Sequence, residues 1–176
     1  MTFPESFASS RLLARRLQPE DASEIHRMHQ DPEQMALLGG VRDEQQTAAY
    51  MARNLAHWSR YGFGPWLLIF REDDRVAGRA LLRHLTLETG DEVEVGYSLH
   101  PVFWGRGLAT EIAGACLEWA RTDLRLASVV ALTRPDNIRS QRVLTKIGMQ
   151  IERQIVHEGE PHLVFRIRFD GPAVDA

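Results

Sequence analysis

The sequence has one cysteine, Cys116, in 176 residues. A lone cysteine cannot form a disulfide within the chain, so the fold does not depend on an oxidising environment. No apolar run is long enough to span a bilayer, and the first residues lack the regions of a signal peptide. No long basic run occurs and the formal net charge is −3, which argues against a nucleic-acid partner. We expect a cytoplasmic protein with no nucleic-acid and no membrane partner.

Internal repeats and low-complexity linkers are also lacking, and glycine and proline occur as isolated residues. The length suits one domain with a sizeable core. Hydrophobic residues make up 44% and charged residues 26% of the chain, which is ordinary for a globular protein. We expect a single domain over residues 1–176, with its core at about 10–169.

The spacing of apolar residues predicts alternating helices and strands. Predicted helices are 19–30, a short piece after Asp31 and Pro32, 44–61, 107–122 and 137–148. Predicted strands are 11–17, 65–72, 75–87, 92–100, 127–133, 149–158 and 161–169. This order predicts an α/β (α+β) protein with one mixed, mostly antiparallel sheet and helices on both faces. The helix 107–122 would join a central pair of parallel strands.

The segment "HPVFWGRGLATE", residues 100–111, places Gly105 and Gly107 around Arg106 just before a helix. A helix N-terminus has N–H groups without internal partners, and glycines let an anion approach them. Arg106 adds a positive charge and Thr110 a hydroxyl, so the segment suits a diphosphate. It lacks the lysine of a Walker loop and the third glycine of the dinucleotide fingerprint. A tight turn without a ligand is the alternative.

Four motifs in order resemble those of the GNAT superfamily of acyl-CoA-dependent N-acyltransferases. They are "RLLARRLQPEDA", "VEVGYSLHPVFWGRGLATE", "NIRSQRVLTKIGM" and "EGEPHLVFRIR", and they span roughly residues 10 to 169. The chain looks most like the RimJ/RimL-like branch, which contains the ribosomal-protein N-terminal alanine acetyltransferases. The resemblance implies a GNAT fold in which the two parallel strands are splayed to hold acyl-CoA.

The resemblance also implies which residues contact acetyl-CoA, the expected cosubstrate, and it implies no metal ion. The main chain near Ser98 and Leu99 would pair with the pantetheine arm. Asn137 would contact the cofactor, cap its helix, or do both. Trp104 stands where the superfamily prefers Gln or Arg. The expected pyrophosphate loop consists of Trp104, Gly105, Arg106, Gly107, Leu108, Ala109 and Thr110.

Acyl transfer to an amine requires a base, because alkyl ammonium groups have a pKa near ~10. By its place in "EVGY" the resemblance implies Glu94 as the base, acting directly or through a water. The alternative is that Glu94 has no catalytic role and is one of several polar residues on a half-exposed strand, where Glu92 shares its face. The other candidates are His84, His100 and His162.

The departing thiolate takes up a proton, although a thiol pKa near ~8.5 makes it a tolerable leaving group without an acid. The tyrosine that serves as acid in many superfamily members corresponds to Leu144. The resemblance instead implies Ser140, at the place of a serine given this role in the N-terminal acetyltransferase branch. A helical serine bonded to its own backbone is the alternative. No covalent intermediate is required, and Cys116 lies in mid-helix beside core residues.

The acceptor is expected to be a primary amine, either a protein N-terminus or a small molecule. Glu92 and Glu94 on one face would favour a cationic acceptor, while Trp58 and Trp66 either line an acceptor groove or belong to the core. One alternative is another acyl donor such as succinyl-CoA, which a cationic side chain near the acyl pocket would favour. Others are a GNAT module that binds CoA without turnover and a nucleotide-phosphate binder of another fold. A homodimer is also possible from the sequence.

Overall fold

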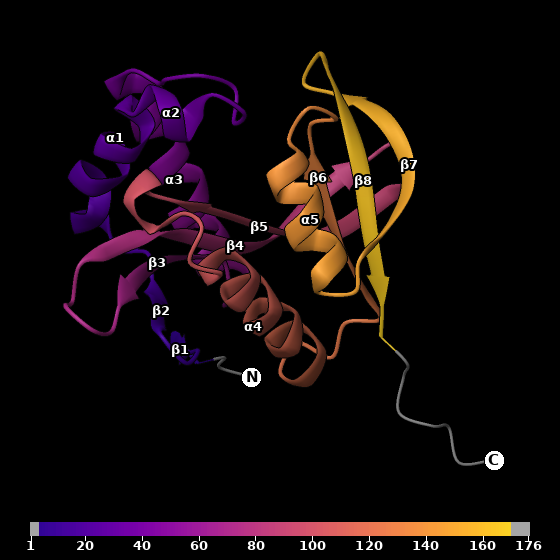
Figure 1. The fold of residues 1–176 in the computed structure, drawn as a ribbon, viewed down its shortest axis with the longest axis horizontal. Helices are drawn as coiled ribbons and strands as arrows, with labels where there is room; N and C mark the ends of the chain where they lie inside the picture. The colour runs from indigo at the N-terminus through magenta and orange to yellow at the C-terminus, as the bar shows by residue number, and fades with distance from the viewer. Residues whose placement is uncertain (1–3, 170–176) are drawn as a thin grey trace.

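The computed structural model describes residues 4–169, and one eight-stranded sheet forms its centre (Figure 1). The order of the strands is β1-β2-β3-β4-β5-β6-β8-β7. β5 and β6 run parallel, and all other neighbours are antiparallel. The predicted mixed sheet with a central parallel pair is therefore confirmed. The strands are β1 (Ser6–Ala8), β2 (Leu12–Arg16), β3 (Pro65–Phe70), β4 (Val76–Leu87), β5 (Gly90–Leu99), β6 (Ser128–Thr133), β7 (Gln150–His157) and β8 (Glu160–Arg168).

Helices cover both faces of the sheet, as the sequence predicts. They are α1 (Ala22–Gln30), α2 (Pro32–Met35), α3 (Glu44–Tyr61), α4 (Leu108–Thr122) and α5 (Ile138–Lys146). Trp66 and Leu68 of β3 pack in one buried cluster with Ile112 of α4. Leu67 between them packs with Met28 of α1 in a second cluster. Because successive strand side chains point to opposite faces, α1 and α3 cover one face and α4 the other.

The longest helix begins and ends at the predicted residues. Asp43 caps α3 by accepting the Gln46 N–H at 2.7 Å, and Gln46 Oε1 accepts the Asp43 N–H at 2.9 Å. This reciprocal pair satisfies two donors that the helix itself cannot. At the other end Gly62 adopts φ +74°, a conformation that favours glycine. No helix within residues 4–169 is long and apolar enough to cross a membrane.

Strand β1 was not predicted, and helix α1 begins later than predicted. Strand β1, residues 6–8, pairs with β2, and Phe7 packs edge-on against Trp66 at 5.1 Å between ring centroids. Three residues are too few to display the alternation that identifies a strand. The helix predicted from residue 19 begins at Ala22, after a 3₁₀ turn. The Asp21 carboxylate accepts the Gln18 N–H at 2.8 Å and pairs with Arg15 at 2.7 Å, which stabilises that turn.

Candidate active site

The two parallel strands, β5 and β6, separate at the centre of the sheet. As far as the structure describes them, β5 and β6 are paired at one position, Glu94 opposite Val130. β5 stays paired with β4 as far as Leu99, opposite Gly78. In Figure 1 the β7–β8 hairpin and α5 accordingly lie on one side, and α1–α3 on the other. The edge of β5 that faces β6 is therefore unpaired with β6 beyond Glu94, as expected of a splayed pair.

The glycine loop follows at the end of β5. Gly105 has φ +73° and Gly107 φ +78°, and a Cβ at Gly105 would meet nothing within 4 Å. These backbone angles, rather than crowding, require glycine. Among the described residues no side chain caps α4, whereas Asn137 caps α5. The turn therefore leaves the N–H groups at the start of α4 without a side-chain partner, so the two explanations of the glycines do not compete.

Side chains around this loop are tied together. The Arg106 guanidinium lies over the Phe70 ring, 4.5 Å from its centroid. Arg11 donates to the Arg106 carbonyl at 2.9 Å and pairs with Glu111 at 2.8 Å. Burial raises the pKa of Glu111, but hydrogen bonds from Ser9 and Arg11 outweigh this and hold the pKa below its usual value. The carboxylate in the first turn of α4 is therefore balanced by Arg11, a contact that no local pattern indicates.

The other predicted cofactor residues lie around the strand opening. Ser98 is buried, and its Oγ accepts the Gln34 amide N–H at 2.9 Å. The Leu99 carbonyl accepts the Trp104 indole N–H at 2.8 Å. Asn137 Oδ1 accepts the Ser140 N–H at 3.1 Å, so it does cap its helix.

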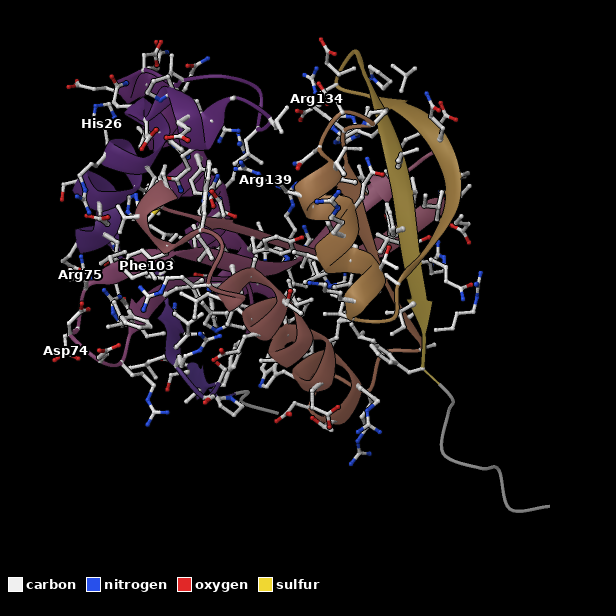
Figure 2. The ribbon with its side chains drawn as sticks, viewed as in Figure 1. His26, Asp74, Arg75, Phe103, Arg134 and Arg139 are labelled. Atoms are coloured by element: carbon white, nitrogen blue, oxygen red, sulfur yellow. The ribbon has the colours of Figure 1, made fainter. Side chains whose placement is uncertain are left out.

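Beside Trp104, the guanidinium of Arg139 on α5 lies 5.1 Å from the indole ring. Figure 2 places Arg139 between α5 and the group formed by α1–α3. Ala109 and Thr110 are half-buried in the first turn of α4, while Leu108 is part of the core. The loop, the strand opening and α5 therefore meet in one region of the molecule.

The two glutamates among the candidate bases are both ion-paired. Glu94 is buried, and its Oε2 accepts the Arg83 Nε–H at 2.7 Å. Coulombic attraction to Glu94 raises the pKa of Arg83 despite burial. Glu92 accepts two hydrogen bonds from Arg166, at 2.5 and 3.0 Å. The acidic face inferred from the sequence is thus neutralised by arginines of β4 and β8.

The candidate acid has a neighbour that the sequence analysis missed. Ser140 Oγ lies 3.0 Å from the hydroxyl of Tyr97, which belongs to β5 beyond the point where β6 departs. Burial raises the pKa of Tyr97 to about 12, despite the hydrogen bond to Ser140. Tyr97 therefore remains protonated at neutral pH. Its alternation with Glu94 in "EVGYS" indicates only that it faces the other side of the sheet.

Several residues considered in the sequence belong to the core. Leu144, Trp58 and Trp66 are buried, so neither tryptophan lines a groove. Cys116 is fully buried, and burial raises the pKa of its thiol to about 12. A buried, protonated thiol is a poor nucleophile.

The candidate histidines make structural contacts. His100 Nε2 lies 3.0 Å from Glu24 of α1, and the His84 ring packs at a tilt against Tyr61 with 4.1 Å between ring centroids. His162 contacts a main-chain carbonyl of its own hairpin at 3.0 Å. Of the candidate bases, Glu94 is the one that lies on β5 at the point where the parallel pair opens.

Comparison with known proteins agrees with this geometry. Residues 11–150 match the family described as acetyltransferase (GNAT) domain. The chain is 28% identical over 145 residues to the uncharacterized N-acetyltransferase YnaD of Bacillus subtilis, a match that covers 82% of both proteins. An acetyltransferase from Agrobacterium tumefaciens superposes with a TM-score of 0.83 at 27% identity, over 96% of each chain.

The fold is also that of RimL, a ribosomal L7/L12 α-N-protein acetyltransferase solved in complex with coenzyme A. RimL superposes with a TM-score of 0.78 at 16% identity, over 96% of this chain and all of its own. The family match extends from β2 through the glycine loop to the beginning of β7. The chain therefore belongs to the GNAT acetyltransferase family and is an acyl-CoA-dependent acetyltransferase.

Proposed function

We propose that the protein transfers an acetyl group from acetyl-CoA to a primary amine by direct attack, without a covalent enzyme intermediate. The acceptor is a protein N-terminus or a small amine. The observation that carries this proposal is the uncapped start of α4 beside the opening between β5 and β6. Burial of Cys116 supports direct attack, because the one thiol of the chain cannot reach a ligand.

The chain offers main-chain donors for the cosubstrate. The N–H groups of Gly107, Leu108, Ala109 and Thr110 have the position and polarity to bind a pyrophosphate. The strand main chain near Ser98 and Leu99 would pair with the pantetheine arm, where β6 no longer occupies that edge. These donors lie on a loop and on strand main chain, so they tolerate Trp104 in place of the Gln or Arg of other members.

Glu94 is proposed as the base. Acetyl-CoA supplies the thioester, and the chain must remove a proton from the attacking ammonium group. Arg83 binds Oε2 of Glu94 and orients the carboxylate, and within the described chain no donor contacts Oε1. Oε1 is therefore the atom that accepts the proton, directly or through a water.

Ser140 is proposed as the acid, with Tyr97 as its positioning partner. As the new C–N bond forms and the C–S bond breaks, the Ser140 hydroxyl donates its proton to the sulfur. Tyr97 lies within hydrogen-bond distance of Ser140 Oγ and remains protonated. It can therefore hold the serine in place, and the serine regains its proton from the attacking nitrogen, which loses its second proton as the amide forms. The cap from Asn137 fixes the turn that carries Ser140.

Calorimetric titration with acetyl-CoA tests the cofactor proposal, with succinyl-CoA and ATP as comparators. We expect micromolar binding of acetyl-CoA and none of ATP. Thiol release in the presence of a panel of amines then separates an enzyme from a CoA-binding module without turnover. A protein that binds none of the CoA thioesters would overturn the proposal.

A further inference from the structure

The face of the sheet under α1–α3 holds two arginines around one aromatic ring. Arg79 of β4 and Tyr50 of α3 are both buried. The Arg79 guanidinium carbon lies 4.6 Å from the centre of the Tyr50 ring. Arg42, from the segment between α2 and α3, lies 5.7 Å from the same ring centre. We refer to Arg42, Tyr50 and Arg79 as the arginine cluster.

Within residues 4–169 neither arginine of the cluster has a carboxylate partner. Arg83, four residues after Arg79 on the same strand, pairs with Glu94 instead. Arg42 makes only long contacts, 3.4 Å to the Leu38 carbonyl and 3.4 Å to Nε2 of His29. Burial and then repulsion from Arg79 lower the pKa of Arg42. Arg79 is buried and Arg42 is half-buried, and buried charges are normally paired. Two neighbouring guanidinium groups without a carboxylate partner therefore call for an anion from outside the chain.

Neighbouring groups add a donor, and the attraction of Glu158, in the turn between β7 and β8, for Arg42 is weaker than the repulsion from Arg79. The Tyr50 hydroxyl is buried and has no hydrogen-bond partner in the described structure. Burial, followed by repulsion from Arg79 and Arg42, lowers the pKa of His29 to about 3, so this histidine is neutral. An unsatisfied buried hydroxyl is costly and is uncommon in native proteins. The hydroxyl and the two arginines together form a set of donors suited to an anion.

The cluster lies next to the proposed pantetheine path. Arg79 is directly opposite Ser98 in the β4–β5 register, and the two side chains share one face of the sheet. Gln34 of α2 reaches the same point through its bond to Ser98 Oγ. Glu94 lies on that face as well, four residues before Ser98 on β5. An anion on the arginine cluster would therefore be close to the reacting groups.

We propose that the arginine cluster binds a carboxylate carried by one of the two substrates. This inference rests on the proposed acetyl transfer at the neighbouring strand opening. Arginine presents a planar pair of donors that matches a carboxylate, and the tyrosine hydroxyl supplies one more. The carboxylate belongs either to the acceptor, an amine of the amino-acid type, or to the acyl group of a dicarboxylic donor such as succinyl-CoA.

Two arms of one kinetic experiment distinguish these sources. In the acceptor arm, thiol release from acetyl-CoA is measured with amino acids and with the corresponding α-amides, each pair differing only in the carboxylate. In the donor arm, acetyl-CoA and succinyl-CoA are compared with one amine. We expect one of the two arms to show a preference for the compound that carries the carboxylate, of about 10- to 100-fold in kcat/KM, as for hydrogen bonds to a charged group.

Variants connect the preference to the cluster. Tyr50→Phe keeps the ring and removes a hydroxyl that bonds nothing, so the protein should fold and the preference should fall several-fold. Arg79→Gln and Arg42→Gln should reduce it towards one. Arg53→Gln, an exposed arginine one turn after Tyr50 on α3, is the matched control and should retain the preference. Thermal unfolding of each variant verifies its fold.

A preference in either arm that the cluster variants lose supports the site and identifies which substrate carries the carboxylate. Equal rates within both pairs would overturn it. So would an equal loss in Arg53→Gln and Arg79→Gln, because a general field of positive charge would then suffice. Absence of CoA binding in the calorimetric titration would instead overturn the proposed acetyl transfer. Binding and turnover without a carboxylate preference would overturn the arginine cluster alone.

Discussion

Replacement of Tyr97 by phenylalanine removes one atom from the proposed active site, the hydroxyl that lies 3.0 Å from Ser140 Oγ. Loss of one neutral hydrogen bond is worth about 0.5 to 1.5 kcal/mol. If that bond positions Ser140 as the bond to sulfur breaks, kcat should fall about 2- to 10-fold. Ser140→Ala removes the proton donor itself and should cost about 10- to 100-fold. This is at or below the low end of acid catalysis, because a thiolate with a conjugate-acid pKa near ~8.5 leaves readily.

The double variant separates a positioning role from an independent one. If Tyr97 acts through Ser140, then Tyr97→Phe should have almost no further effect on kcat in the Ser140→Ala background. Stopped assays of thiol release at saturating acetyl-CoA and amine provide the four rates. The KM for acetyl-CoA should remain within about two-fold of the parent value, because ground-state binding does not use this bond.

Thr145→Ala is the matched control on the same helix. Its hydroxyl donates to the Gln141 carbonyl at 2.9 Å, which is the ordinary behaviour of a helical hydroxyl. We expect kcat to be unchanged in this variant. Fully multiplicative effects of Tyr97→Phe and Ser140→Ala would refute the positioning role of Tyr97. An unchanged rate in Ser140→Ala would refute the role of Ser140 as the acid.

Three further perturbations test the remaining parts of the site. Glu94→Gln should lower kcat about 10²- to 10⁴-fold at neutral pH, as for loss of a general base, with acetyl-CoA affinity by calorimetry nearly intact; an unchanged rate would exclude Glu94. Gly107→Glu should abolish acetyl-CoA binding, because it places a charged side chain at a left-handed residue beside the start of α4; undiminished affinity would contradict the function of the loop. Denaturant unfolding should show that stability falls as pH drops from about 6.5 towards 3, because the unfolded chain protonates His29 while burial and the nearby arginines lower its folded pKa to about 3; His29→Gln should flatten that slope.

The fold was largely accessible from local patterns. Alternation in "EVEVGYS" identifies β5, and Asp43 and Gly62 mark the two ends of α3. The order of elements then predicts the parallel pair, because a strand–helix–strand unit has few other arrangements. The glycine loop could also be recognised from a local pattern, because a residue with left-handed backbone angles before a helix is usually glycine.

The contacts between elements were not accessible in this way. Tyr97 and Ser140 are 43 residues apart in the chain and meet only because α5 packs beside the end of β5. Periodicity specifies which face of an element is buried, but it does not specify which residue of another element lies opposite. The arginine cluster shows this limit more clearly, because Arg42 lies outside regular structure and Arg79 follows a strand pattern that any polar residue would satisfy.

The charge of the sheet face that carries Glu92 and Glu94 depends on which residues form ion pairs, and not only on how many acidic residues the strand has. Two glutamates at alternate positions of β5 indicate an acidic face that would attract a cation. Arg166 and Arg83 neutralise Glu92 and Glu94 across the sheet. Within residues 4–169, Arg42 and Arg79 on the same face of the sheet have no such carboxylate partner, and their charges are positive. Since unpaired charges shielded from water act strongly on their surroundings, the proposed arginine cluster would favour an anionic group on one of the two substrates, in addition to the amine that attacks.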